Sequence, residues 1–102
     1  MVILSWPILR EFGKQHPDAA SALKDWYQEV SLAEWRNLAD VRLFSNSVDY
    51  VGNFRYVFNI WGNRYRLIAA IVFSTRTVFV KFVGTHQAYD KINAATIDYS
   101  KL

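Results

Sequence analysis

The chain has 102 residues, 52% of them hydrophobic and 17% aromatic, with no cysteine and a net charge of +3. This length predicts a single domain over residues 1–102 that can bury its own core, and the lack of cysteine excludes disulfides, thiolate metal sites and cysteine nucleophiles. The longest strictly apolar run, residues 67–73, is far shorter than the roughly 18 residues of a membrane span, and residues 1–8 lack a secretory leader pattern. We therefore expect a cytoplasmic protein with no membrane partner.

The first half of the chain predicts helices. Residues 2–5 are a short apolar stretch that can form a first strand, and Ser5 can cap a helix with Pro7 in its first turn. Gly13 weakens or ends that helix, and Pro17 starts the most regular helix of the chain, where apolar residues recur at i, i+3, i+4 and i+7. The apolar positions are Ala19, Ala22, Leu23, Trp26, Tyr27 and Val30. We expect this stripe to pack against a sheet.

A capping-box pattern over residues 31–34 predicts a short third helix that contains Trp35 and Leu38. Residues 40–53 have no clear periodicity and carry turn-type residues. They lead into a region of strand-like alternation.

The second half predicts an antiparallel meander. Gly62-Asn63 is a two-residue hairpin signal between a strand that begins near Phe54 and a strand over residues 64–74. A third strand covers residues 77–83, and residues 88–97 can form a final short helix. The expected fold class is therefore α+β, a small antiparallel sheet with the N-terminal helices packed on one side.

Basic residues concentrate in the predicted sheet. Residues 1–53 contain five Lys or Arg against seven Asp or Glu, whereas residues 54–91 contain six against one. This asymmetry favours an anionic partner on the sheet side. A solvated sheet face with chance asymmetry is the alternative.

Several of these basic residues are predicted to share one surface. Arg64 and Arg66 are two positions apart, so we expect their side chains on one face, with Asn59 and Trp61 across the hairpin and Arg55 farther along. Guanidinium groups bind phosphate through paired donors, and an indole can stack on an unpaired base. The alternative is that the arginines pair with helix carboxylates and that Trp61 shields the turn.

His86 is the better candidate of the two histidines for chemistry. It follows Gly84-Thr85 at a predicted strand end, where side chains become accessible, whereas His16 precedes a proline at a helix boundary. Histidine suits proton transfer because it changes charge near neutral pH. The chain has no H-E-x-x-H motif and no glycine-rich phosphate loop, so neither a metal nor a cofactor is expected.

The pattern F-N-I-x-G-N-x-Y-R-L-I followed by V-x-V-K-F-V-G-T-H-x-x-Y-D-K-I resembles the HigB group of bacterial toxins, densest over residues 56–92. These belong to the RelE-like mRNA interferases of type II toxin–antitoxin systems. The resemblance implies a RelE-like fold and cleavage of mRNA, commonly on translating ribosomes. It also implies a HigA-like helix-turn-helix antitoxin as the partner. The protein would contact operator DNA only indirectly, through the complex with this antitoxin.

Carried over to this chain, the resemblance makes Arg66, His86, Tyr89 and Asp90 the catalytic candidates. Metal-independent attack by the RNA 2′-hydroxyl needs a base, an acid and positive charge at the phosphate. Arg66 is the expected charge stabiliser and His86 a proton-transfer group, with the base and the acid not assigned separately. The expected RNA contacts are Arg55, Asn59, Trp61, Arg64, Lys81 and Lys91.

Three other functions are compatible with the same residues: a non-catalytic RNA-binding module, a protein-interaction domain that docks an acidic peptide, and a decayed toxin. An RNA-binding module would tolerate loss of His86, whereas loss of its arginines would weaken binding and change the salt dependence.

Overall fold

The computed structural model describes residues 1–98. The elements in chain order are β1 (Val2–Ile3), α1 (Trp6–Gln15), α2 (Pro17–Leu32), α3 (Leu38–Phe44), β2 (Asp49–Tyr50), β3 (Arg55–Ile60), β4 (Tyr65–Val72), the 3-10 helix η1 (Phe73–Thr75), β5 (Thr77–Thr85) and α4 (His86–Tyr89). Over these residues, no helix combines the length and the apolar character that crossing a membrane requires.

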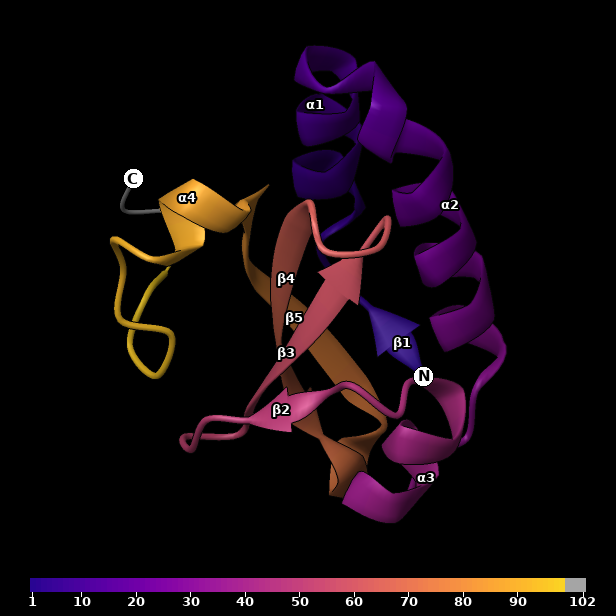
Figure 1. The fold of residues 1–102 in the computed structure, drawn as a ribbon. Helices are drawn as coiled ribbons and strands as arrows, with labels where there is room; N and C mark the ends of the chain where they lie inside the picture. Colours follow the sequence, from indigo (N-terminus) through magenta and orange to yellow (C-terminus); the bar gives the residue numbers. More distant parts are fainter. Residues whose placement is uncertain (99–102) are drawn as a thin grey trace.

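The strands form one sheet in the order β1-β5-β4-β3-β2 (Figure 1). Strands β3, β4 and β5 are the predicted antiparallel meander, while β1 pairs with β5 in parallel and β2 adds two antiparallel residue pairs to β3. Helices α1 and α2 lie along one side of the sheet, and α4 lies on the other side with the C-terminal chain (Figure 1). The predicted α+β class is confirmed, with a sheet that is mostly antiparallel.

The main core lies between the sheet and the two long helices. The predicted apolar stripe of α2 is the buried one, because Leu23, Trp26 and Val30 are each at most 4% exposed. They pack with the inward residues of the strands, which include Phe58 and Leu67. Each large apolar side chain buried in this way stabilises the fold by about 1.5–3 kcal/mol.

The start of α1 is tied to the sheet by its N-cap residue. Ser5 occupies the predicted cap position, but its hydroxyl accepts a hydrogen bond from the Val80 amide at 3.0 Å instead of capping the helix. The helix also continues through Gly13, which is buried against α2 and lies close to Ala20. Gly13 was predicted to weaken or end the helix; it does not end it, and its lack of a side chain allows the close approach of α2.

The third helix lies later in the chain than predicted. The expected capping box at residues 31–34 does not form, because Ser31 lies in the last turns of α2 and its hydroxyl donates to the carbonyl four residues earlier at 2.6 Å. Asn37 caps α3 instead, accepting from the Asp40 amide at 3.0 Å, and the Asp40 carboxylate accepts from the Arg36 amide at 2.9 Å. A short polar side chain can satisfy exposed amides in this way wherever a helix begins.

The hairpin between β3 and β4 has a longer turn than Gly62-Asn63 alone predicts. Ile60 pairs with Tyr65, so residues 61–64 form the turn, and its first two residues have positive φ angles of 51° and 65°. Arg64 consequently lies in the turn. It does not share the strand face of Arg66, as the sequence spacing had predicted.

The second face of the sheet carries a smaller core. Val57, Ile68 and Phe82 are buried there beneath apolar residues of the C-terminal segment, among them Tyr89 and Ile97. The predicted helix over residues 88–97 is wrong, since α4 covers only the four residues His86–Tyr89 and the chain then continues in turns. The C-terminal segment therefore covers part of the face that was expected to be open.

Tyr65 joins the start of α2 to β4, because its hydroxyl donates a 2.7 Å hydrogen bond to Asp18. This hydrogen bond is the main cause of a raised Tyr65 pKa, and burial adds to it. A raised pKa favours the protonated phenol in the folded state, so the stabilisation is present below the ordinary tyrosine pKa of about 10 and is lost as pH rises above it.

We therefore expect wild type to be more stable than Tyr65→Phe by a constant margin up to about pH 9, and this margin to shrink above about pH 10. Urea unfolding of both proteins at a series of pH values measures the margin. A margin that stays the same through pH 10.5 would contradict the role given to this hydrogen bond.

Candidate active site

Arg66 lies at the second position of β4, on the face turned away from α1 and α2. Asn59 of β3 and Gly84 of β5 are its neighbours across the two ladders. Its guanidinium is held by the hairpin turn: Nη1 donates to the Asn63 carbonyl and Nη2 to the Asn63 Oδ1, each at 3.1 Å. Arginine has five donors, and no partner for Nε lies within the described residues. The turn therefore orients the fork and leaves donors for an anion.

Tyr89 lies next to this guanidinium. The Arg66 Cζ is 6.0 Å from the centre of the Tyr89 ring, at the outer limit of a cation–π contact. The ring belongs to the second core, which includes Ile68 and Phe82. Apolar packing thus fixes the position of a phenol beside the arginine.

The short helix α4 presents His86 and Asp90. Its start is fixed twice, because the Thr85 hydroxyl accepts from the Ala88 amide at 3.1 Å and the His86 amide donates to the Arg64 carbonyl at 3.0 Å. The His86 Nδ1 lies 3.3 Å from the Asp90 Oδ2, with side chains 49% and 59% exposed. The carboxylate therefore orients the ring through Nδ1, and no partner for Nε2 lies within the described residues.

Gly84 allows the site to pack closely. A Cβ atom at this position would lie 2.5 Å from the ring of Phe82, on the face that carries Arg66. Phe82 in turn packs in the cluster that holds Tyr89. A larger residue at position 84 would therefore displace the support beneath the tyrosine.

A shallow pocket of about 380 Å³ lies beside α4. It is lined by Arg64, Tyr65, Thr85, His86 and Gln87. This volume falls in the range of sites that hold small ligands. His86 therefore borders a hollow between α4 and the hairpin turn.

Arg55 is not an exposed RNA contact, which corrects the prediction made for it. It is only 7% exposed, and its guanidinium donates to the Ala94 carbonyl at 3.4 Å and to the Ile97 carbonyl. Its side chain lies beneath the C-terminal segment on the second face of the sheet. Alternation along the strand predicted the face correctly, but not the chain that covers it.

We expect Arg55→Ala to destabilise the protein by about 1–3 kcal/mol, because it leaves the partly buried carbonyl groups of Ala94 and Ile97 without this donor. Urea unfolding measures the loss, and hydrogen exchange should show faster exchange in residues 92–97. Arg10→Ala removes an exposed arginine of α1 and should change stability by less than about 0.5 kcal/mol. Equal stability of the two variants would contradict the anchoring role of Arg55.

Trp61 and Arg64 form a separate pair on the α2 side of the hairpin. The Arg64 Cζ lies 4.6 Å from the Trp61 ring centre, and Nη1 lies 3.6 Å from the Asp18 Oδ2. For Arg64 the alternative of pairing with a helix carboxylate is therefore observed, with Asp18 as the partner. The predicted shared surface of three arginines does not form.

The other predicted RNA contacts lie on the second face of the sheet, some next to Arg66 and some farther from it. Asn59 is exposed and directly opposite Arg66, and Lys91 is exposed immediately after α4. Lys81 lies at a bulge of β5, half-buried, with its amine 5.6 Å from the Phe79 ring centre. Asn59 is thus the candidate that the sheet places next to the arginine.

Sequence reasoning missed Asn63 and Thr85. Asn63 fixes the Arg66 guanidinium and Thr85 caps the helix that carries His86. Both residues stand inside the G-N and G-T pairs of the family pattern. Their place in that pattern was the available signal, but their hydrogen bonds depend on the hairpin geometry.

The fold and the site define a class of protein: a small α+β domain in which an arginine lies beside a tyrosine, and a histidine and an aspartate pair on the short helix that follows the sheet. The family model described as "HigB_toxin, RelE-like toxic component of a toxin-antitoxin system" matches residues 19–92. The chain is also 30% identical over 97 residues to the mRNA interferase HigB of Escherichia coli O6:H1 (strain CFT073), covering 90% of this chain and 91% of that protein.

This chain therefore belongs to the HigB family of RelE-like toxins, as the resemblance predicted. The toxic component of a toxin–antitoxin system has an antitoxin as its partner. The matched residues include Arg66, His86, Tyr89 and Asp90.

Proposed function

We propose that this chain is an mRNA interferase, an endoribonuclease that inhibits translation and growth by cutting messenger RNA. The observation that carries the proposal is the Arg66 guanidinium, fixed by Asn63 and lying beside Tyr89. His86 and Asp90 lie at either end of the same short helix as the tyrosine. The relative named mRNA interferase HigB supports the choice of RNA as substrate.

In the proposed reaction, the 2′-hydroxyl of one nucleotide attacks the adjacent phosphorus and the bond to the 5′-oxygen of the next nucleotide breaks. The products carry a 2′,3′-cyclic phosphate and a 5′-hydroxyl. DNA lacks the attacking hydroxyl, so it is not a substrate. The protein's own side chains supply the proton transfers and the charge stabilisation.

Arg66 binds the phosphate that is cut. Negative charge on its non-bridging oxygens rises in the transition state, and a guanidinium already held in place stabilises that charge without reorganising. The two bonds to Asn63 provide this fixed position. Asn63 is therefore a positioning residue for Arg66.

His86 transfers a proton, either from the attacking hydroxyl or to the leaving oxygen. Asp90 holds the ring through Nδ1, so Nε2 is the nitrogen that meets the substrate. Tyr89, which lies beside Arg66, orients the phosphate next to that guanidinium. The pH dependence of the cleavage rate distinguishes these two roles of His86.

Exposed residues around the cluster bind the flanking RNA. Asn59, next to Arg66, contacts a base or sugar, and Lys91 and Lys81 contact phosphates farther along the second face. Trp61 and Arg64 form a stacking surface at the opposite side of the turn, where a neighbouring base can stack on the indole. Such phosphate contacts make binding weaker at higher salt.

The proposal extends to the partners and the location. Cleavage takes place on mRNA in translating ribosomes in the cytoplasm. A HigA-like helix-turn-helix antitoxin neutralises the chain and brings it to operator DNA only as part of their complex.

The chemical nature of the cut ends tests the proposed reaction. Purified protein is incubated with translated mRNA, and the new 5′ ends are tested for labelling by polynucleotide kinase with and without prior phosphatase. Direct labelling, together with cyclic phosphates at the 3′ ends, is the expected result. Ends that already carry a 5′-phosphate would overturn the mechanism, and RNA that is bound but never cut would favour a non-catalytic RNA-binding module.

A further inference from the structure

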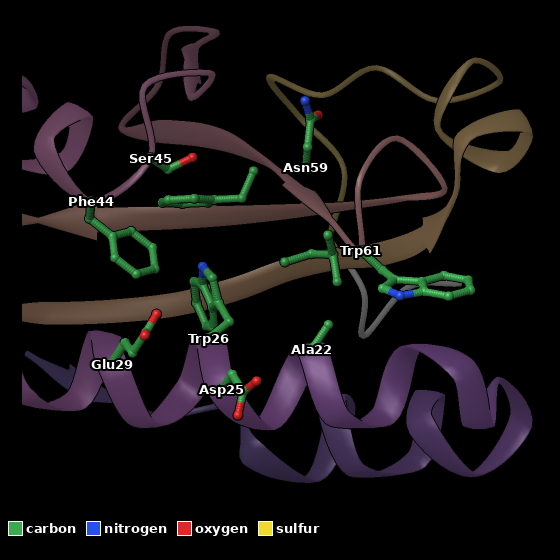
Figure 2. A pocket seen from close by; sticks show the side chains of 10 residues that line it. Ala22, Asp25, Trp26, Glu29, Phe44, Ser45, Asn59 and Trp61 are labelled. Carbon is green, nitrogen blue, oxygen red and sulfur yellow. The ribbon is translucent and has the colours of Figure 1, made fainter.

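A second site lies on the other side of the sheet, between α2 and β3. It is a groove of about 270 Å³ lined by residues that include Asp25, Trp26, Glu29, Phe58 and Trp61. Figure 2 shows Asp25 and Glu29 leaving α2 on the side of the strand, with Phe44 toward one end and Trp61 at the other. None of the catalytic candidates lines this groove, although Asn59 and Trp61, two of the proposed RNA contacts, do.

The strand beside the groove has an open edge. β2 pairs with β3 only at Tyr56 and Val57, so within the described chain no strand pairs with the outer edge of residues 58–60. The Val51 amide donates to the Arg55 carbonyl at 3.0 Å on the β2 side. Because strand residues alternate in the direction of their backbone groups, the amide and carbonyl of Asn59 point to the open edge. Such an edge is a template for an added strand.

A buried donor in the groove lacks an acceptor. Trp26 is only 4% exposed, and its Nε1 has no hydrogen-bond partner in the part of the chain that the structure describes. An indole nitrogen can only donate, and buried donors are rarely left unpaired. The missing partner is an acceptor, such as the backbone carbonyl of a bound chain.

The groove is negatively charged. Asp25 and Glu29 are exposed, lie four residues apart on α2, and have no ion-pair partner within residues 1–98. Like charges at this spacing destabilise a helix, and a Lys or Arg placed between them would remove the repulsion. The same two carboxylates repel RNA phosphates, so this groove favours a basic polypeptide.

We propose that the groove binds an extended basic segment of the antitoxin. The segment adds beside Asn59, offers a carbonyl to the Trp26 Nε1, and places a Lys or Arg against Asp25 and Glu29. This inference rests on the proposed function, since it takes the antitoxin of the system as the occupant.

Charge reversal tests the proposal. The affinity of the purified chain for its antitoxin is measured by titration calorimetry at several salt concentrations for wild type and for Asp25→Lys/Glu29→Lys. We expect at least tenfold weaker binding by the double variant. The control Glu11→Lys/Glu34→Lys changes the net charge equally at exposed positions off the groove and should bind within about twofold of wild type. Wild-type affinity in the groove variant would overturn the proposal.

The indole of Trp26 gives a second readout that does not depend on charge. The chain has four tryptophans, and the signal lost in Trp26→Phe identifies the Trp26 N–H in a nitrogen–proton NMR spectrum. A downfield shift of this signal on addition of antitoxin is expected. A signal that does not move on addition of antitoxin would overturn the proposal. A signal that already moves as the concentration of the free chain rises would also overturn it, because it would assign the groove to a second copy of the chain.

RNA cleavage by the free variants separates this inference from the proposed function. Asp25→Lys/Glu29→Lys should cut RNA at the wild-type rate without antitoxin, because both carboxylates lie on α2, on the side of the sheet opposite to the face that carries Arg66. Loss of RNA binding in this variant would assign the groove to RNA and overturn the proposal. Inactive wild type that still binds antitoxin through the groove would refute only the proposed function.

Discussion

Arg66→Ala is expected to lower the rate of RNA cleavage by roughly 100- to 1,000-fold, the usual effect of removing one preorganised donor from a developing anion. The effect should fall on the cleavage step under single-turnover conditions with saturating RNA. Arg66→Lys keeps the charge but loses the fork that Asn63 holds. Its rate should lie between those of wild type and Arg66→Ala.

The control for this result is Arg10→Ala, which removes one positive charge from an exposed position of α1. It should cleave RNA within about twofold of wild type, because a single exposed charge away from the site contributes little free energy. Circular dichroism should show both variants folded, since Arg66 is only partly buried. If Arg66→Ala cleaved RNA as fast as Arg10→Ala, Arg66 would have no role in the mechanism.

His86→Ala is expected to slow cleavage by roughly 100- to 10,000-fold, the range for loss of a general acid or base. It should also remove one limb of the pH–rate profile, because a residue that transfers a proton must change its protonation state. A merely structural residue would lower the rate without changing the shape of that profile. Loss of the limb on the acidic side identifies His86 as the base, and loss on the alkaline side identifies it as the acid.

Gln87→Ala is the matched control for His86, because it changes the next exposed residue of the same short helix. It should keep both the rate and the pH profile of wild type. His86→Gln, which can form hydrogen bonds but cannot exchange a proton near neutral pH, should be as slow as His86→Ala. Activity in His86→Gln close to wild type would mean that His86 positions the substrate and does not transfer a proton.

Local patterns predicted much of the fold. The period of the α2 stripe identified the face that is buried, with Leu23 and Trp26 among its core residues. Strand alternation identified the meander, and Asn59 lies across from Arg66 as predicted. These predictions succeed because periodicity depends on burial against the sheet.

The errors arise where strand pairing, or the cover provided by another segment of the chain, decides the outcome. The turn is longer than Gly62-Asn63 predicts because Ile60 pairs with Tyr65, which moves Arg64 to the α2 side. Arg55 looked like an exposed cation because nothing in the local sequence shows that residues 94–97 fold over it. The sequence pattern predicts on which face of the sheet a residue lies, but not which other segment of the chain packs over it.

The candidate site depended on the resemblance more than on periodicity. Arg66 and Tyr89 are 23 positions apart in sequence numbering, and only the pairing of β4 with β5 and the α4 turn bring them to 6.0 Å. The family pattern contained both residues, and with them Asn63 and Thr85 in supporting positions. Chemistry alone identified arginine and histidine as suitable residue types.

The most direct test of the proposed function is the mapping of RNA ends in a reconstituted translation reaction. Parallel reactions contain wild type, Arg66→Ala, His86→Ala and Arg10→Ala, each with translated mRNA and with naked mRNA. We predict cuts at codon positions of translated mRNA for wild type and Arg10→Ala, and none for the other two variants. Equal cutting by Arg66→Ala and His86→Ala, or no cutting by folded wild-type protein, would contradict an interferase centred on these residues.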